Sequence, residues 1–325
     1  MNTPPCAFPL MTRVLLIVVL CLASTAAYAV ERGVLVRDAN VYLSPDATST
    51  KLITFPRGTE LIILERATSP WINVEPMGTG PSLDPIATDR IKPVTGWMQD
   101  KGLVRASTPN GDQVLFGEAS SSEAEATRRR GRKGAANDAY RLYRMTAEYF
   151  PGSPLAGEAL YRAADIRWQL ERAEVLSRPS AKHVDPYMRA QIEEELMRRV
   201  IKKYPKTKWA DLAAFRLIDN KLCGDWQGEA KCPEKEADIY EKYVAEHPQS
   251  PVAAEALYQA AWREAALVSI YKNAGDNDKS AEAKSKALQL VQRITANYQN
   301  DWAHRARALG FLLEQGIPTF GPGSE

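Results

Sequence analysis

The sequence has few of the residues on which most enzyme active sites depend. Among its 325 residues there are only three histidines and four cysteines. It contains no glycine-rich phosphate loop, no metal-spaced pair and no nucleophile elbow. His183 falls in an expected loop, His247 at an expected helix end and His304 within an expected helix. We therefore predict a protein that is not an enzyme and that uses no metal and no cofactor.

Strong charge and a long apolar run are also lacking. The formal net charge is +2, which gives no general reason to expect nucleic-acid binding. The apolar run 14–22 is far shorter than the roughly 20 residues of a membrane span. It follows Arg13 and precedes Ala27-Tyr28-Ala29, an order typical of a secretory signal. We predict that residues 1–29 are a signal peptide cleaved after Ala29, and that the protein is exported to the periplasm or cell envelope without an integral membrane segment.

The cysteines divide into two pairs. Cys6 and Cys21 lie in the predicted signal peptide, and the bulky Leu22 stands where a lipid-attachment motif needs a small residue, so a lipid anchor is disfavoured. Cys223 and Cys232 remain, with turn-forming residues between them. An even number of cysteines in an exported chain predicts a disulfide. A metal site is the alternative, but it would need more ligands than two thiols.

Residues 30–107 are predicted to form a small all-β module. Short runs rich in branched and aromatic residues are separated by turn residues, and the expected strands are 34–37, 40–43, 52–55, 61–64, 71–74 and 96–98. Several short strands in so short a stretch predict a small barrel. The segment 75–95, rich in proline and glycine, is expected to be an insertion and not a strand pair.

Five short runs stand in a characteristic order and spacing: Asn40-Val41-Tyr42-Leu43-Ser44-Pro45, Lys51-Leu52-Ile53, Phe55-Pro56-Arg57-Gly58-Thr59, Trp71-Ile72-Asn73-Val74 and Gly96-Trp97-Met98. Over residues 33–105 these runs resemble a bacterial SH3 domain. The resemblance implies a targeting or ligand-binding module at the cell wall. Tyr42, Trp71 and Trp97 are the aromatic residues on which a peptide or sugar would stack. Core packing is the other interpretation of all three, and it is the favoured one for Trp71 and Trp97.

Residues 108–133 are predicted to contain a linker and a first helix. The turn-rich run Thr108-Pro109-Asn110-Gly111-Asp112 indicates a domain boundary. Ser120-Ser121-Ser122 offer helix caps, and Arg128-Arg129-Arg130 precede Gly131. We therefore expect a helix over about 120–130. The basic run 128–133 either completes this helix or binds an anionic polymer or lipid surface.

Residues 134–316 repeat one pattern four times. Its landmarks are Phe150-Pro151-Gly152-Ser153, Tyr204-Pro205-Lys206-Thr207, His247-Pro248-Gln249-Ser250 and Tyr298-Gln299-Asn300-Asp301. Apolar residues recur in the same columns before each landmark, and alanines follow three of them. Proline ends one helix and Ser or Thr caps the next, so the pattern predicts an all-α array of helix pairs.

Two of these landmarks resemble a known group of proteins. Tyr149-Phe150-Pro151-Gly152-Ser153-Pro154-Leu155-Ala156 and His247-Pro248-Gln249-Ser250-Pro251-Val252-Ala253 are similar to elements of tetratricopeptide-like periplasmic proteins. These include outer-membrane-protein assembly lipoproteins and cell-division coordinators linked to the Tol-Pal system. The resemblance implies a tetratricopeptide-like solenoid that binds a protein partner. The candidate contact residues, each with packing as its alternative, are Tyr140, Tyr161, Arg162, Trp168, Tyr258 and Trp262.

Together these observations predict a multidomain protein, a small SH3-like barrel followed by a helical solenoid and a disordered tail at 317–325. We expect an exported cell-envelope adaptor or scaffold, whose barrel binds wall or peptide ligand and whose helices bind an envelope protein. A structural component of an outer-membrane or cell-division assembly is the alternative. A cell-wall hydrolase is weaker, because the two remaining cysteines are better explained as a disulfide.

Overall fold

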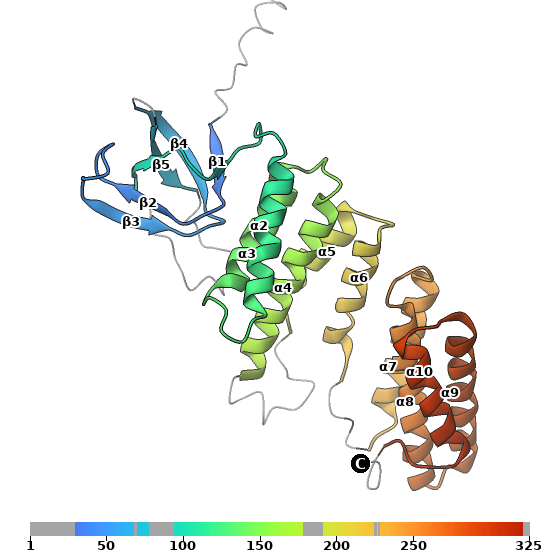
Figure 1. Ribbon diagram of the computed structural model, residues 1–325. Coiled ribbons are helices and arrows are strands. Elements are labelled where there is room, and N and C mark those ends of the chain that lie inside the picture. Colours follow the sequence, from blue (N-terminus) through green and yellow to red (C-terminus); the bar gives the residue numbers. More distant parts are fainter. Residues whose placement is uncertain are drawn as a thin grey trace, which may run out of the picture.

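The computed structural model describes residues 30–67, 70–77, 94–177, 191–223, 226 and 228–320. The predicted signal peptide and its cleavage site, most of the insertion 75–95, His183 and the end of the tail lie outside the described residues. The described part forms an antiparallel sheet followed by nine α-helices, with the sheet at one end of the molecule and α7 to α10 at the other (Figure 1). Within it, no helix is long and apolar enough to cross a membrane.

The sheet has seven strands in the order β3-β2-β6-β5-β4-β1-β7. Their bounds are β1 Arg32–Leu35, β2 Ala39–Tyr42, β3 Lys51–Phe55, β4 Glu60–Arg66, β5 Trp71–Pro76, β6 Gly96–Gln99 and β7 Leu103–Val104. The six predicted strands are all present to within a few residues, and β7 was not predicted. Every pairing is antiparallel, so each strand alternates between two faces of the sheet.

One face of the sheet carries its core. Val41, Ile72 and Met98 on the central strands are almost fully buried, as is Phe55 on β3. Leu103 of β7 belongs to the same cluster although β3 and β7 are the two ends of the strand order. The sheet is therefore curved around this core.

Helix α2, Gly111–Ala126, begins about nine residues before the start expected from the sequence. The three consecutive serines lie inside the helix and do not cap it. Leu115 and Ala119, one helical turn apart, are fully buried and belong to the main cluster of the first helices. The three arginines of the basic run come after the last turn and are exposed, so the expectation that they complete the helix is wrong.

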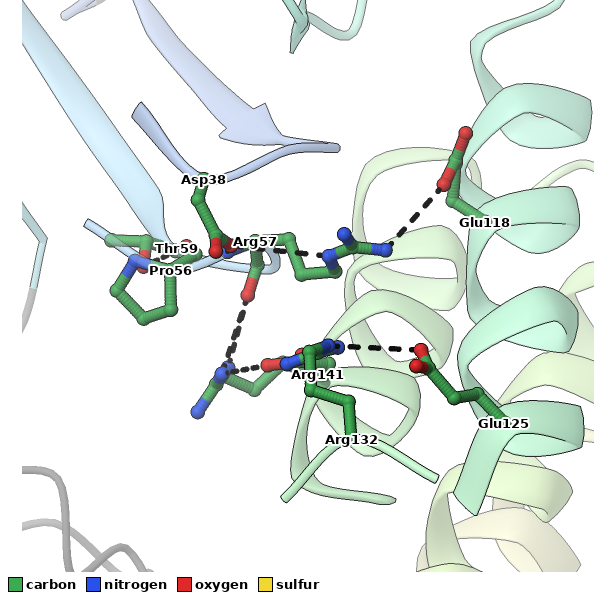
Figure 2. A network of polar contacts seen from close by, with 9 residues as sticks. Asp38, Pro56, Arg57, Thr59, Glu118, Glu125, Arg132 and Arg141 are labelled. Atoms are coloured by element: carbon green, nitrogen blue, oxygen red, sulfur yellow. Dashed lines mark hydrogen bonds and ion pairs between the residues drawn. The ribbon is translucent and has the colours of Figure 1, made fainter. Parts of the chain in front are cut away.

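A network of polar contacts joins the sheet to the first helices (Figure 2). Arg57, in the turn before β4, donates its backbone N–H to Asp38 over 3.0 Å and extends its guanidinium to 3.9 Å from Glu118 of α2. Its carbonyl oxygen accepts two N–H groups of Arg141, from the following helix, at 3.3 and 3.4 Å. Gly58 has φ +77°, and a Cβ there would lie 2.7 Å from Cβ of Arg141. A glycine is needed both for this conformation and for this approach.

Helices α3 to α10 form the four predicted pairs. They are α3 Ala135–Tyr149 with α4 Ala156–Ser177, α5 Glu195–Lys203 with α6 Lys208–Arg216, α7 Lys231–Glu246 with α8 Ala253–Asn273, and α9 Asn277–Asn297 with α10 Asp301–Glu314. A short 3-10 helix, Asp219–Lys221, follows α6. One predicted column, Thr146, Val200, Tyr243 and Ile294, is buried in all four copies. The repeat therefore marks the face along which the pairs pack.

The turns inside the pairs explain the landmark residues. Phe150, Tyr204 and His247 have nearly the same backbone angles, with φ between −126° and −129° and ψ between 54° and 59°. Each donates its N–H to the carbonyl of the buried column residue four positions earlier. Tyr298, which no proline follows, instead has ψ 147°. At the three landmarks with proline, the residue before it lies outside the helical region, as predicted.

Two of the four expected caps act at the helix start. Thr207 and Asn300 accept the N–H groups of Ala210 and Ala303. The hydroxyls of Ser153 and Ser250 accept N–H groups only two residues on, within the turns that precede α4 and α8. Proline follows each of these serines, and the regular helix begins after the additional turn. Pro154 and Pro251 therefore lie in the turns before the helices and not at the first helical position, where proline is common.

Helix α6 lies between two buried clusters. Ala213 on α6 and Leu217 just after it belong to the cluster of α2 to α5, whereas Phe215 packs against the cluster of α7 to α10. The Phe215 ring is 5.3 Å from that of Tyr243, and the carbonyl of Asp211 accepts the Tyr243 hydroxyl over 2.9 Å. A single nine-residue helix thus connects the two halves of the array.

The predicted disulfide is present, with Cys223 and Cys232 joined and their Cα atoms 6.0 Å apart. The expectation of a disordered tail fails for its first residues. Ile317 donates its N–H to Leu312, and the ring of Phe320 lies against Trp226 inside the disulfide loop. A contact between distant parts of the chain therefore orders the segment up to Phe320.

Candidate ligand-binding site

Three of the aromatic residues proposed from the sequence lie on one face of the sheet. Tyr42 on β2 is paired with Trp97 on β6, and Trp97 is paired with Asn73 on β5. Trp71 lies two residues before Asn73 and therefore on the same face. The rings of Tyr42 and Trp71 are 5.8 Å apart and nearly perpendicular. We call Tyr42, Trp71, Asn73 and Trp97 the aromatic face.

The aromatic face is separate from the core of the sheet. Along β5 and β6, half-buried residues of the aromatic face alternate with the fully buried Ile72, Val74 and Met98. Trp71 and Trp97 do not belong to the core cluster, so the expectation that they fill the core is wrong. Their partly exposed rings are available for stacking.

Asn73 adds a polar group that the sequence reasoning missed. Its side-chain oxygen is shielded from solvent and accepts no hydrogen bond within the part of the chain that the structure describes. An unpaired buried acceptor costs about 1 to 3 kcal/mol, which a donor from a ligand would recover. The sequence could have indicated this role of Asn73, because it lies two residues after Trp71 and the two side chains therefore share one face of a strand.

Gly96 brings two strands of the aromatic face together. A Cβ on Gly96 would lie 2.6 Å from Cγ1 of Val41 and 2.8 Å from the carbonyl oxygen of Tyr42. These distances are too short for any side chain, so only glycine allows β2 and β6 to approach in this way. The same approach sets Tyr42 opposite Trp97.

The candidate residues on the helices do not converge on one site. Tyr140 and Trp168 are 7% and 1% exposed and belong to the core of the first helices, which contradicts their assignment to ligand contact. Arg162 is paired with Glu123 of α2 and Glu158 of its own helix, at 2.8 and 2.7 Å. These three side chains have structural roles.

The other candidates on the helices pack against aromatic residues, Tyr161 and Tyr258 against residues of the next pair, and Trp262 against Trp226, whose ring is 5.1 Å away. The ring of Tyr161 stacks on Trp209 of the next pair at 5.7 Å, and that of Tyr258 lies 5.3 Å from Trp302 of the next pair. Burial in this contact raises the pKa of Tyr161 to about 12, so its hydroxyl stays protonated at neutral pH. Trp209 and Trp302 were missed, although each lies near the start of the second helix of its pair. The contacts of Tyr161 and Tyr258 join consecutive pairs.

Two further titratable side chains, His247 and Glu264, lie in the third helix pair. His247 follows the last residue of α7, its Nδ1 is hydrogen-bonded to the Asp211 carboxylate at 2.8 Å, and its ring stacks on that of Tyr243. Burial raises the pKa of Glu264, on α8, to about 7. No cluster of three metal-ligating side chains occurs among the residues that the structure describes.

The fold is that of a mixed β-plus-α multidomain chain. No protein-family model matches the sequence, and no curated protein matches it. A solved structure described as a DHF79 filament is matched at 16% identity, over 62% of this chain and 96% of that chain, with a TM-score of 0.23. At that TM-score the match carries no argument about fold or function.

Proposed function

We propose that the protein is an exported adaptor of the cell envelope, in which the aromatic face binds a wall ligand and the helical array holds a protein partner. The observation that carries the proposal is the aromatic face itself, three half-buried rings beside an unpaired amide oxygen. Rings stack on the flat surfaces of peptide groups and sugars, and the amide oxygen would orient a donor. The proposal has no catalytic step.

We further propose that the sheet is an SH3-like barrel. The resemblance of residues 33–105 to bacterial SH3 domains supports this, as does the single core shared by Phe55 and Leu103 at the two ends of the strand order. The strand order itself is open, because among the described strands β3 pairs only with β2 and β7 only with β1, so the barrel would be closed by this shared core and not by hydrogen bonds between the end strands. The outer face is then free for ligand.

We also propose that the four helix pairs form a tetratricopeptide-like solenoid. The support is the equivalent contact between consecutive pairs, Tyr161 with Trp209 and Tyr258 with Trp302. Stacked pairs of this kind create extended surfaces for protein partners. Export is supported by the signal-like first 29 residues and by the disulfide, which persists in oxidising compartments.

The test is co-sedimentation of the purified chain with purified peptidoglycan. We expect the Trp71→Ala variant to bind at least about tenfold more weakly, because it removes one stacking ring. Phe311→Ala is the matched control, since Phe311 is an aromatic residue on α10, is 58% exposed and lies outside the aromatic face. If the unchanged chain does not bind peptidoglycan, the wall-binding role falls and a structural role in an envelope assembly is favoured.

A further inference from the structure

Three aromatic rings from separate segments meet beside the disulfide. Trp226 lies in the loop that the Cys223–Cys232 disulfide closes, and its ring is 5.1 Å from that of Trp262 on α8. The ring of Phe320, beyond the end of α10, lies 5.4 Å from that of Trp226. This aromatic cluster is distinct from the aromatic face of the sheet, because α8, which carries Trp262, lies at the opposite end of the molecule from the sheet (Figure 1).

A buried ion pair supports this cluster. Arg263 on α8 donates through Nε to Glu236 of α7 at 2.8 Å, and both side chains are almost fully buried. The other oxygen of Glu236 accepts the backbone N–H of Cys223 at 2.7 Å, which ties the disulfide loop to the pair. The guanidinium carbon of Arg263 is 5.8 Å from the rings of Trp226 and of Trp262. The two tryptophans are therefore held in place independently of the tail.

The tail fills this cluster incompletely. Trp226 is only 7% exposed, yet its indole N–H has no hydrogen-bond acceptor in the described part of the chain. The hydroxyl of Thr319, next to Phe320, is likewise shielded and unpaired among the described residues. Phe320 thus supplies an aromatic ring but leaves a buried donor unsatisfied, which is unfavourable. A peptide that supplies both a ring and a carbonyl oxygen would fit better.

The tail is also lightly attached. Helix α10 ends at Glu314, and Gly316 adopts the left-handed conformation with φ +68°. Ile317, the next residue, is 43% exposed. When the segment detaches, the Phe320 ring is therefore the main apolar surface of the tail that becomes exposed to solvent.

We propose that the surface of Trp226 and Trp262 is a binding site for a peptide segment that carries an aromatic residue, and that Phe320 occupies it as an intramolecular competitor. The partner's carbonyl oxygen pairs with the Trp226 indole N–H, and its aromatic ring replaces that of Phe320. The disulfide keeps Trp226 against Trp262. This proposal is independent of the ligand of the aromatic face.

The test uses the tail's own sequence as the probe. A fluorescently labelled peptide of residues 315–320, Gln-Gly-Ile-Pro-Thr-Phe with blocked ends, is titrated into the full chain and into a chain shortened after Gly316. The tethered tail competes with the peptide at an effective concentration in the millimolar range. A peptide with a Kd of about 0.1 mM for the free site would therefore bind the shortened chain about tenfold more tightly than it binds the full chain. The peptide with Phe320→Ala is the matched control and is expected to bind neither chain.

Two further measurements guard against misfolding of the shortened chain. The full-length Phe320→Ala variant keeps the entire tail and is expected to bind the unaltered peptide like the shortened chain. Its indole N–H resonances report whether Trp226 changes environment, and far-UV circular dichroism reports whether the helices persist. Equal affinity of the peptide for the full chain and for both variants would overturn the proposal, as would tight binding of the Phe320→Ala peptide. Full affinity after reduction would overturn the role given to the disulfide.

Discussion

The buried ion pair between Glu236 and Arg263 allows a quantitative test of how the C-terminal half is held together. The two side chains are 2% and 7% exposed, so removing either partner leaves the other charge buried without its counter-ion. Such a loss costs about 3 to 5 kcal/mol of unfolding free energy. Glu236→Ala and Arg263→Ala are each expected to cost this much, whereas the double variant costs less than their sum by about 2 kcal/mol or more.

The assay is urea unfolding of the four proteins of this cycle with the disulfide intact, followed by tryptophan fluorescence. Glu246→Ala is the control on the same helix, because Glu246 pairs with Lys242 at 3.8 Å and both side chains are exposed. That substitution is expected to cost less than about 0.5 kcal/mol. The reasoning is refuted if Glu236→Ala costs no more than Glu246→Ala, or if the two single effects simply add.

Two other predictions concern the binding face and the pH dependence of stability. Gly96→Ala is expected to weaken peptidoglycan binding about as much as Trp71→Ala does, because the new Cβ clashes with the strand that carries Tyr42; unchanged binding in the co-sedimentation assay would contradict this. For Glu264, burial raises the pKa to about 7, above that of an unfolded chain, so its contribution to stability is present at low pH and is lost as the pH rises through about 7. Glu264→Gln should therefore raise the unfolding free energy by about 1 to 2 kcal/mol near pH 8.5 but much less near pH 5, after allowance for solvent screening. Urea midpoints at the two pH values test this, and an equal gain at both would rule out titration of Glu264 as the cause.

Much of the fold could be predicted because its signals are local. The turn residues and the alternation of the short runs located six strands, and proline after an aromatic residue or histidine located three helix ends. Strand β7 was missed because two residues, Leu103 and Val104, are too few to show alternation. The start of α2 was misplaced because its buried residues, Leu115 and Ala119, give a weaker signal than three consecutive serines.

The candidate site was predicted only in part because its assembly is not local. Tyr42, Trp71 and Trp97 were assigned to strands, but nothing near them in the sequence says that β6 pairs between β2 and β5. On the helices, Trp168 is buried and Tyr258 is half-buried although both lie on predicted repeat helices. Which side of a helix its neighbours cover depends on the packing of distant segments. For the same reason the contact of Phe320 with Trp226 had no signal in the sequence.

The short helix α6 has a mechanical consequence for the whole chain. Two separately packed bodies meet on its opposite sides, one that includes the first helices and one that includes Trp226 and Trp262. Toward the C-terminal body, α6 contributes ring contacts of Phe215, hydrogen bonds of Asp211 and the packing of Ala214, and Ile218 just after the helix is buried in that body. A change in the angle between the two bodies would disturb mainly these contacts, whereas a change within either body would disturb its buried cluster. A partner that contacts both bodies would therefore act first on the angle between them.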